Sequence, residues 1–78
     1  MTIRKNTSFF ALLIENIPFA SIGIVKVDEY SVTYSINSLD GKFIPFDYKV
    51  YRREMTFKNA EYVAQTINKR IERNWFHD

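Results

Sequence analysis

Polar and hydrophobic residues alternate most regularly in two stretches on either side of an Asp-Gly pair. The apolar positions of these stretches are Tyr30, Val32, Tyr34 and Ile36, followed by Ile44, Phe46, Tyr48 and Val50. Alternation with a period of two is typical of a strand that buries one face and leaves the other in water. Asp40-Gly41 provides residues that accept positive φ angles. The sequence therefore predicts a β-hairpin that turns at this pair.

Another strand is predicted before the hairpin, within residues 17–28. Its branched side chains favour extended structure, and they are Ile22, Ile24, Val25 and Val27. Apolar residues occupy both faces, so the pattern predicts a central strand of the sheet, covered on one side by a helix. A tight turn at Asp28-Glu29 then leads into the hairpin.

The end of the hairpin carries two further signals. Pro45 has no amide hydrogen to donate to a neighbouring strand, which predicts that the last strand lies at an edge of the sheet. Met55 and Phe57 fall out of step with the preceding alternation. A bulge or bend near Arg52-Arg53 would explain this change of parity.

The first apolar segment, residues 8–15, fits two structures. Ser8 is a suitable helix cap, and Phe9, Phe10, Leu12 and Leu13 follow it at helical spacing. A short apolar run is also compatible with a buried strand. We favour the strand, because the following meander offers it a neighbour.

The clearest helix is predicted over residues 60–75. Asn59 precedes it as a candidate cap, and the basic residues of its last half suit the negative end of the helix dipole. The apolar residues that form one stripe are Val63, Ala64, Ile67, Ile71 and Trp75. We expect this stripe to pack on the even-numbered face of the hairpin.

These elements together predict an α+β fold in one small domain, residues 1–78. The expected architecture is an antiparallel three- to four-stranded β-meander with one C-terminal amphipathic helix packed on one face. Hydrophobic residues make up 46% of the chain and aromatic residues 17%, which is too apolar for a disordered segment.

Composition excludes several kinds of site. The chain has no cysteine, so disulfides, thiolate metal sites and thiol nucleophiles are excluded. The longest apolar run, residues 9–14, is too short to span a bilayer, and no signal-peptide pattern is evident. We therefore expect a cytoplasmic protein that does not associate with membranes.

The sequence offers no arrangement typical of an active site. His77 is the single histidine and lies next to the end of the chain, where it would be poorly held as a general base. The carboxylates show no spacing typical of a metal site or an acid–base pair, and the two glycines do not form a phosphate loop. We expect no enzymatic activity, no cofactor and no metal.

Basic and aromatic residues are candidates for nucleic-acid binding. Lys49, Arg52, Arg53 and Lys58 lie between the edge strand and the last helix, with Tyr51 among them. Tyr62, Lys69 and Arg73 are predicted on the outer face of that helix. Basic side chains contact phosphates and aromatic rings stack on bases. No known nucleic-acid motif accompanies these residues, and the net charge is only +2.

Aromatic residues are also candidates for protein binding. Phe43 and Tyr51 are predicted on the wet face of the sheet, and Phe76 projects opposite the core stripe of the helix. Exposed aromatic residues and arginines are typical anchors of interfaces. An open edge strand also offers backbone groups for strand addition or for a homodimer.

The sequence therefore favours a small non-catalytic protein-binding module that acts on a larger protein or complex. A phage- or mobile-element-type inhibitor or adaptor would have this size and lack of catalytic groups. The alternative is a nucleic-acid-binding accessory protein that uses the basic and aromatic surface. Under the alternative, replacing both Arg52 and Arg53 by alanine should reduce affinity for nucleic acid.

Overall fold

The computed structural model describes residues 8–76 and contains two helices and three strands. The elements are α1 (Phe9–Asn16), β1 (Ala20–Val27), β2 (Ser31–Ser38), β3 (Phe46–Tyr51), a 3-10 turn (Arg52–Glu54) and α2 (Ala60–Asn74). The strands form one antiparallel sheet in the order β1-β2-β3. The α+β class and the antiparallel meander are thus confirmed, and a second helix joins the one that was predicted. His77 and the other residues outside 8–76 are not described.

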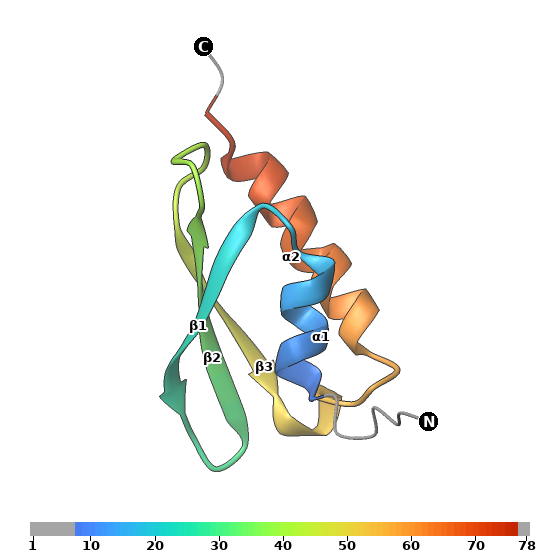
Figure 1. Ribbon diagram of the computed structural model, residues 1–78. Coiled ribbons are helices and arrows are strands. Elements are labelled where there is room, and N and C mark those ends of the chain that lie inside the picture. The colour runs from blue at the N-terminus through green and yellow to red at the C-terminus, as the bar shows by residue number, and fades with distance from the viewer. Residues whose placement is uncertain (1–7, 77–78) are drawn as a thin grey trace, which may run out of the picture.

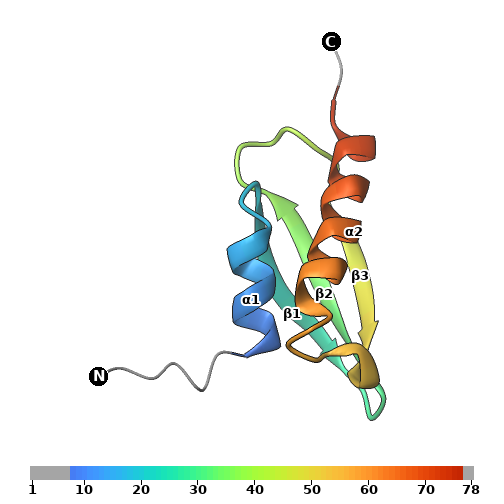
Figure 2. The same ribbon diagram turned by 90° about the vertical axis from the view of Figure 1, so that its right-hand side faces the viewer.

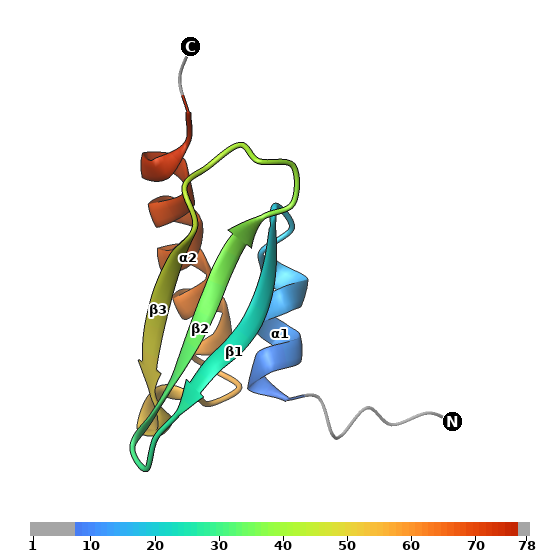
Figure 3. The same ribbon diagram turned by 90° about the vertical axis from the view of Figure 1, so that its left-hand side faces the viewer.

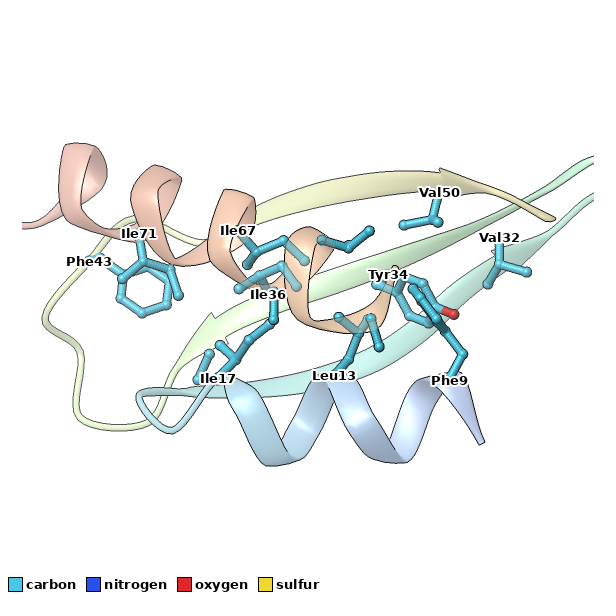
Figure 4. Packing of buried hydrophobic residues seen from close by; sticks show 14 residues of the cluster. Phe9, Leu13, Ile17, Val32, Tyr34, Ile36, Phe43, Val50, Ile67 and Ile71 are labelled. Carbon is cyan, nitrogen blue, oxygen red and sulfur yellow. The ribbon is translucent and has the colours of Figure 1, made fainter. Parts of the chain in front are cut away.

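Both helices lie on the same face of the sheet, α1 beside β1 and α2 beside β3 (Figures 1 and 2). The opposite face is uncovered by any helix of the described residues (Figure 3). The buried residues between the two layers come from every element except the 3-10 turn (Figure 4). Val32, Tyr34 and Ile36 point inward from β2, as their alternation predicts, and meet Val63, Ile67 and Ile71 of α2 in one core.

The first segment is a helix, so the prediction of a strand is wrong. The hydroxyl oxygen of Ser8 accepts a hydrogen bond from the amide of Ala11 at 3.1 Å, which caps the first turn. Phe9 and Leu13, four residues apart, are buried together on one side of α1. Packing of this stripe against the sheet and α2 selects the helix, where the sequence alone fits both structures.

The position of β1 follows from this difference. A strand at residues 8–15 would have paired with β1 and made it central, as predicted. Because these residues form α1, β1 is an edge strand. Its pairing with β2 shifts register between Ile24 and Lys26, so Val25 is an extra residue in the ladder.

The connection from β2 to β3 is longer than the predicted tight turn. It covers residues 39–45, and Gly41 (φ 73°) is the residue with positive φ within residues 8–76. The hydroxyl oxygen of Ser38 accepts a hydrogen bond from the amide of Lys42 at 2.7 Å, and its own hydrogen is donated to Asp40. Pro45 directly precedes β3, which lies at the other edge of the sheet as predicted.

The two ends of α2 also differ from expectation. The side chain of Asn59 makes no capping hydrogen bond, and Trp75 lies just beyond the last helical residue. Trp75 instead forms an antiparallel bridge with Phe43. The amide of Phe76 donates to the carbonyl of Lys42 at 2.9 Å. These bonds fasten the β2–β3 connection to the end of α2.

Candidate binding surfaces

Tyr51 is the centre of a basic cluster on the uncovered face of the sheet. Tyr51 and Lys49 lie on the side of β3 opposite the buried Val50. The Lys49 ammonium lies 5.5 Å and the Arg53 guanidinium carbon 5.2 Å from the centre of the Tyr51 ring. These distances allow cation–π attraction. The structure therefore brings together three of the predicted binding residues in what we call the Tyr51 cluster (Lys49, Tyr51, Arg53).

Arg52, predicted with this group, has a structural partner. Its Nε and Nη2 atoms donate to the carbonyl oxygen of Asp28 at 3.1 and 3.0 Å. Its backbone amide donates to the carbonyl oxygen of Tyr30 at 2.8 Å. Arg52 thus ties the end of β3 to the β1–β2 turn, so part of its hydrogen-bonding capacity is used inside the fold.

The predicted binding residues of α2, Tyr62, Lys69 and Arg73, lie along a furrow between α2 and β3. Two hollows form the furrow, and both are lined by Tyr48 and Thr66. One hollow, of about 210 Å³, is completed by Lys69, Arg70 and Arg73, and we call it the basic pocket. The other, of about 300 Å³, is the adjoining hollow, lined further by Val50, Glu54, Asn59, Tyr62 and Val63.

Sequence reasoning missed two residues that shape this furrow. The Arg70 guanidinium lies 4.7 Å from the centre of the Phe46 ring, a cation–π contact between α2 and β3. Tyr48 lines both hollows. The alternation of β3 already directed Phe46 and Tyr48 toward the helix. The position of Arg70 over the Phe46 ring could not be predicted, because it depends on how α2 packs against β3.

Phe43 was predicted on the exposed face, and this prediction is wrong. Its side chain is 1% exposed and packs against Trp75, with ring centres 6.4 Å apart. The irregular connection before Pro45 turns Phe43 inward and leaves Ile44 exposed, which reverses the predicted parity. Phe76 and Lys58 are exposed, as predicted, but neither lines the furrow.

A further apolar groove lies at the end of α2 next to the link between α1 and β1. It has a volume of about 470 Å³, and its lining residues are Pro18, Phe19, Asn68, Ile71, Glu72 and Trp75. The Phe19 ring meets Trp75 edge to face at 6.2 Å. The two rings thus support each other and partly fill the groove.

Three apolar residues are exposed in the second half of β1. The exposed fractions of Ile24, Val25 and Val27 are 52%, 56% and 61%. Ile24 and Val27 pair with Tyr34 and Val32, so they belong to the face that carries the helices. Neither helix reaches over this end of β1 (Figure 3). We call these three residues the β1 apolar edge.

The charged groups of these surfaces are almost all exposed, and two tyrosines are perturbed by burial. Burial raises the pKa of the Tyr48 phenol, and Glu54 and Tyr62 add to this, while Arg70 opposes it. Burial also raises the pKa of Tyr34, opposed by Arg52. Both phenols keep their protons at neutral pH, as an ordinary tyrosine does, and remain hydrogen-bond donors.

The described part of the chain shows neither a metal-binding cluster nor a membrane-spanning helix. No three potential ligands among His, Cys, Asp and Glu come together in residues 8–76. No helix within the same residues is long and apolar enough to cross a bilayer. Comparisons of the chain with models of protein families, with curated proteins and with solved structures find no match.

Proposed function

We propose that this protein is a small non-catalytic module that binds a larger protein through the β1 apolar edge. The observation that carries the proposal is the coincidence of two features on one strand. β1 has no strand neighbour on its outer side within residues 8–76, and Ile24, Val25 and Val27 are exposed along it. Both features suit a partner that adds an extended segment to the sheet.

An exposed apolar edge of this kind is unusual unless it has a partner. Free edges promote unwanted pairing, and proteins usually blunt them with charges, prolines or bulges. β1 carries one lysine, Lys26, and the bulge at Val25. Lys26 lies 3.9 Å from Asp28, which partly neutralises it. The protection is thus incomplete, and the remaining apolar surface is available for an interface.

The expected mode of action is occupation of a surface on the partner. Main-chain hydrogen bonds from the outer side of β1 would provide affinity, and the three apolar side chains would provide specificity. Such an interface depends little on salt, because its energy comes mainly from apolar burial. This mode suits an inhibitor or an adaptor.

The test is an affinity capture from the native cell, washed at low and then high salt, with and without nuclease. The Val25→Lys/Val27→Lys variant places cations on the edge without breaking the strand. Leu39→Lys/Phe57→Lys adds the same charge at exposed apolar residues elsewhere. We expect a defined partner to resist both treatments, to be lost with the edge variant, and to be kept by the control variant.

Two results would overturn the proposal. If the Val25→Lys/Val27→Lys variant still binds the partner, the β1 apolar edge is not the interface. Sedimentation that shows a dimer of the purified wild-type protein, dissociated by the same variant, would identify the occupant of the edge as a second copy of the chain.

A further inference from the structure

We propose that the basic pocket between α2 and β3 binds a phosphate group of a nucleic-acid backbone. The pocket is lined by Tyr48, Thr66, Lys69, Arg70 and Arg73. Three of these side chains are cationic and two carry hydroxyls, and none is a carboxylate. Such a set of donors around one hollow suits a tetrahedral anion with several acceptor oxygens.

The helix positions the cations on one side. Lys69 and Arg70 follow Thr66 by three and four residues, and Arg73 follows them by four and three. The four residues therefore form one stripe along α2. The stacking of Arg70 on Phe46 holds one guanidinium between helix and strand. A guanidinium fixed in this way loses little freedom when it binds phosphate, and it can donate two parallel hydrogen bonds.

These cations have no carboxylate partner within the described chain. The single ion pair of residues 8–76 joins Lys26 to Asp28, and neither residue lines the basic pocket. Glu72 lines the apolar groove on another side of α2, and Glu54 lines the adjoining hollow rather than the basic pocket. Three neighbouring positive charges repel each other, and a bound anion would relieve this repulsion.

The two hydroxyls have different roles. Thr66 donates its hydrogen to the carbonyl oxygen of Tyr62 at 3.1 Å, so it is not a free donor. The Tyr48 hydroxyl makes no such bond within residues 8–76. It is protonated at neutral pH like an ordinary phenol, and burial raises its pKa further in the same direction. The Tyr48 hydroxyl and the three cations are therefore the donors available to phosphate.

The surroundings favour nucleic acid over a lone phosphate or an acidic peptide. Tyr62 lies on the same side of α2, lines the adjoining hollow, and is 70% exposed. From Arg73 to Tyr62 the helix extends about 16 Å at roughly 1.5 Å per residue. A strand that places a phosphate in the basic pocket can thus bring a base to the Tyr62 ring, where stacking adds affinity.

The test is fluorescence anisotropy of a labelled single-stranded oligonucleotide at low and high salt. Lys69→Gln/Arg73→Gln removes two pocket cations from exposed helical positions, where glutamine keeps the helix. Lys26→Gln/Lys42→Gln removes the same charge elsewhere. We expect the pocket variant to lose at least about tenfold in affinity and its log–log salt slope to fall by about 1.4. The control should change affinity less than about threefold.

A second variant and two competitors distinguish binding of nucleic acid from binding of free phosphate or of an acidic polypeptide. Tyr62→Leu should weaken oligonucleotide binding by about tenfold through lost stacking. Neither inorganic phosphate nor polyglutamate at equal charge concentration should displace the oligonucleotide. Circular dichroism melting of each variant verifies that the fold is intact.

Three results would overturn this proposal. They are absence of salt-dependent oligonucleotide binding, equal losses in the pocket and control variants, and displacement by polyglutamate as effective as by unlabelled oligonucleotide. The last would assign the pocket to an acidic protein. The outcome is independent of the β1 apolar edge, because Val25→Lys/Val27→Lys leaves the pocket unchanged.

Discussion

Arg52 and Arg53 are neighbours in the sequence with different surroundings. The guanidinium of Arg52 is hydrogen-bonded to the β1–β2 turn, whereas that of Arg53 rests on the exposed Tyr51 ring. The sequence places both in one binding set, because spacing does not reveal which side chain reaches a backbone carbonyl. The structure thus separates a residue that supports the fold from one that faces solvent.

We predict that the two arginines contribute unequally to stability. Arg52→Ala should lower the free energy of unfolding by about 1.5 kcal/mol, because it removes charge-assisted hydrogen bonds at an exposed site. Arg53→Ala should cost about 0.5 kcal/mol, the scale of an exposed cation–π contact. Urea unfolding of the two variants measures this difference. Equal losses would contradict the structural role of Arg52.

Tyr34 should make the protein less stable in alkali. Burial holds the pKa of this phenol above its ordinary value of 10.0. The unfolded chain therefore releases the proton first, so stability that is fully present below pH 10 declines as the pH rises through the folded pKa. Tyr34→Phe keeps the ring and removes the titrating group.

Urea unfolding at several pH values between about 8 and 11 tests the Tyr34 prediction. The wild type should lose stability with pH more steeply than Tyr34→Phe. The remaining slope of the variant includes Tyr48, whose pKa burial also raises. Equal slopes in the two proteins would show that Tyr34 does not control the alkaline loss.

At the scale of elements, regular periodicity was a reliable guide and short or irregular segments were not. β2 covers four repeats of the strand period, and the apolar stripe of α2 covers several helical turns. In each segment the pattern therefore distinguishes strand from helix. α1 has too few residues for its period to exclude a strand. Its packing in one core with α2 selects the helix, and the Asn68 side chain of α2 donates to the carbonyl oxygen of Asn16 at the end of α1. Phe43 lies in the irregular β2–β3 connection, where the alternation of a strand does not predict which side chains are buried.

The same reasoning explains what was predictable of the candidate site. The basic and aromatic residue types around β3 and α2 are evident in the sequence. Their grouping depends on how α2 lies against β3, which sets Arg70 over Phe46 and leaves Lys58 outside the furrow. The β1 apolar edge was not predicted, because it requires that α1 does not pair with β1.

The cap of α1 should be important because the helix has only 8 residues. Ser8→Ala should lower the free energy of unfolding by about 1 kcal/mol through loss of the bond to the Ala11 amide. Ser8→Asp, which can make the same bond, should retain most of the wild-type stability. Urea unfolding measures both. A neutral alanine variant would indicate that packing alone maintains α1.

For the whole molecule, the two proposed surfaces lie at opposite edges of the sheet. The β1 apolar edge is on one side of β2, and β3 with the furrow is on the other (Figures 2 and 3). A protein partner and a nucleic-acid strand would therefore not compete for the same atoms. This arrangement would suit an adaptor that binds both at once.

The small core should make the fold sensitive to single cavities. A chain of 78 residues is expected to have a free energy of unfolding of about 4–12 kcal/mol. Ile67→Ala, at a fully buried position, should cost about 2–5 kcal/mol. Ile44→Ala, at an exposed isoleucine, should cost less than about 0.5 kcal/mol. Thermal melting by circular dichroism measures both, and similar melting temperatures would contradict the assigned core.

The order β1-β2-β3 means that each strand pairs with its neighbour in sequence. Contacts so close along the chain are associated with rapid folding. β1, β2 and β3 can therefore pair without waiting for a distant segment, whereas α2 adds to them from the C-terminal side of the chain. Ala60, Val63, Ala64, Ile67 and Ile71 complete the core from α2. Whenever α2 is undocked, the sheet displays its apolar face, and the protein would then be a natural client for a chaperone.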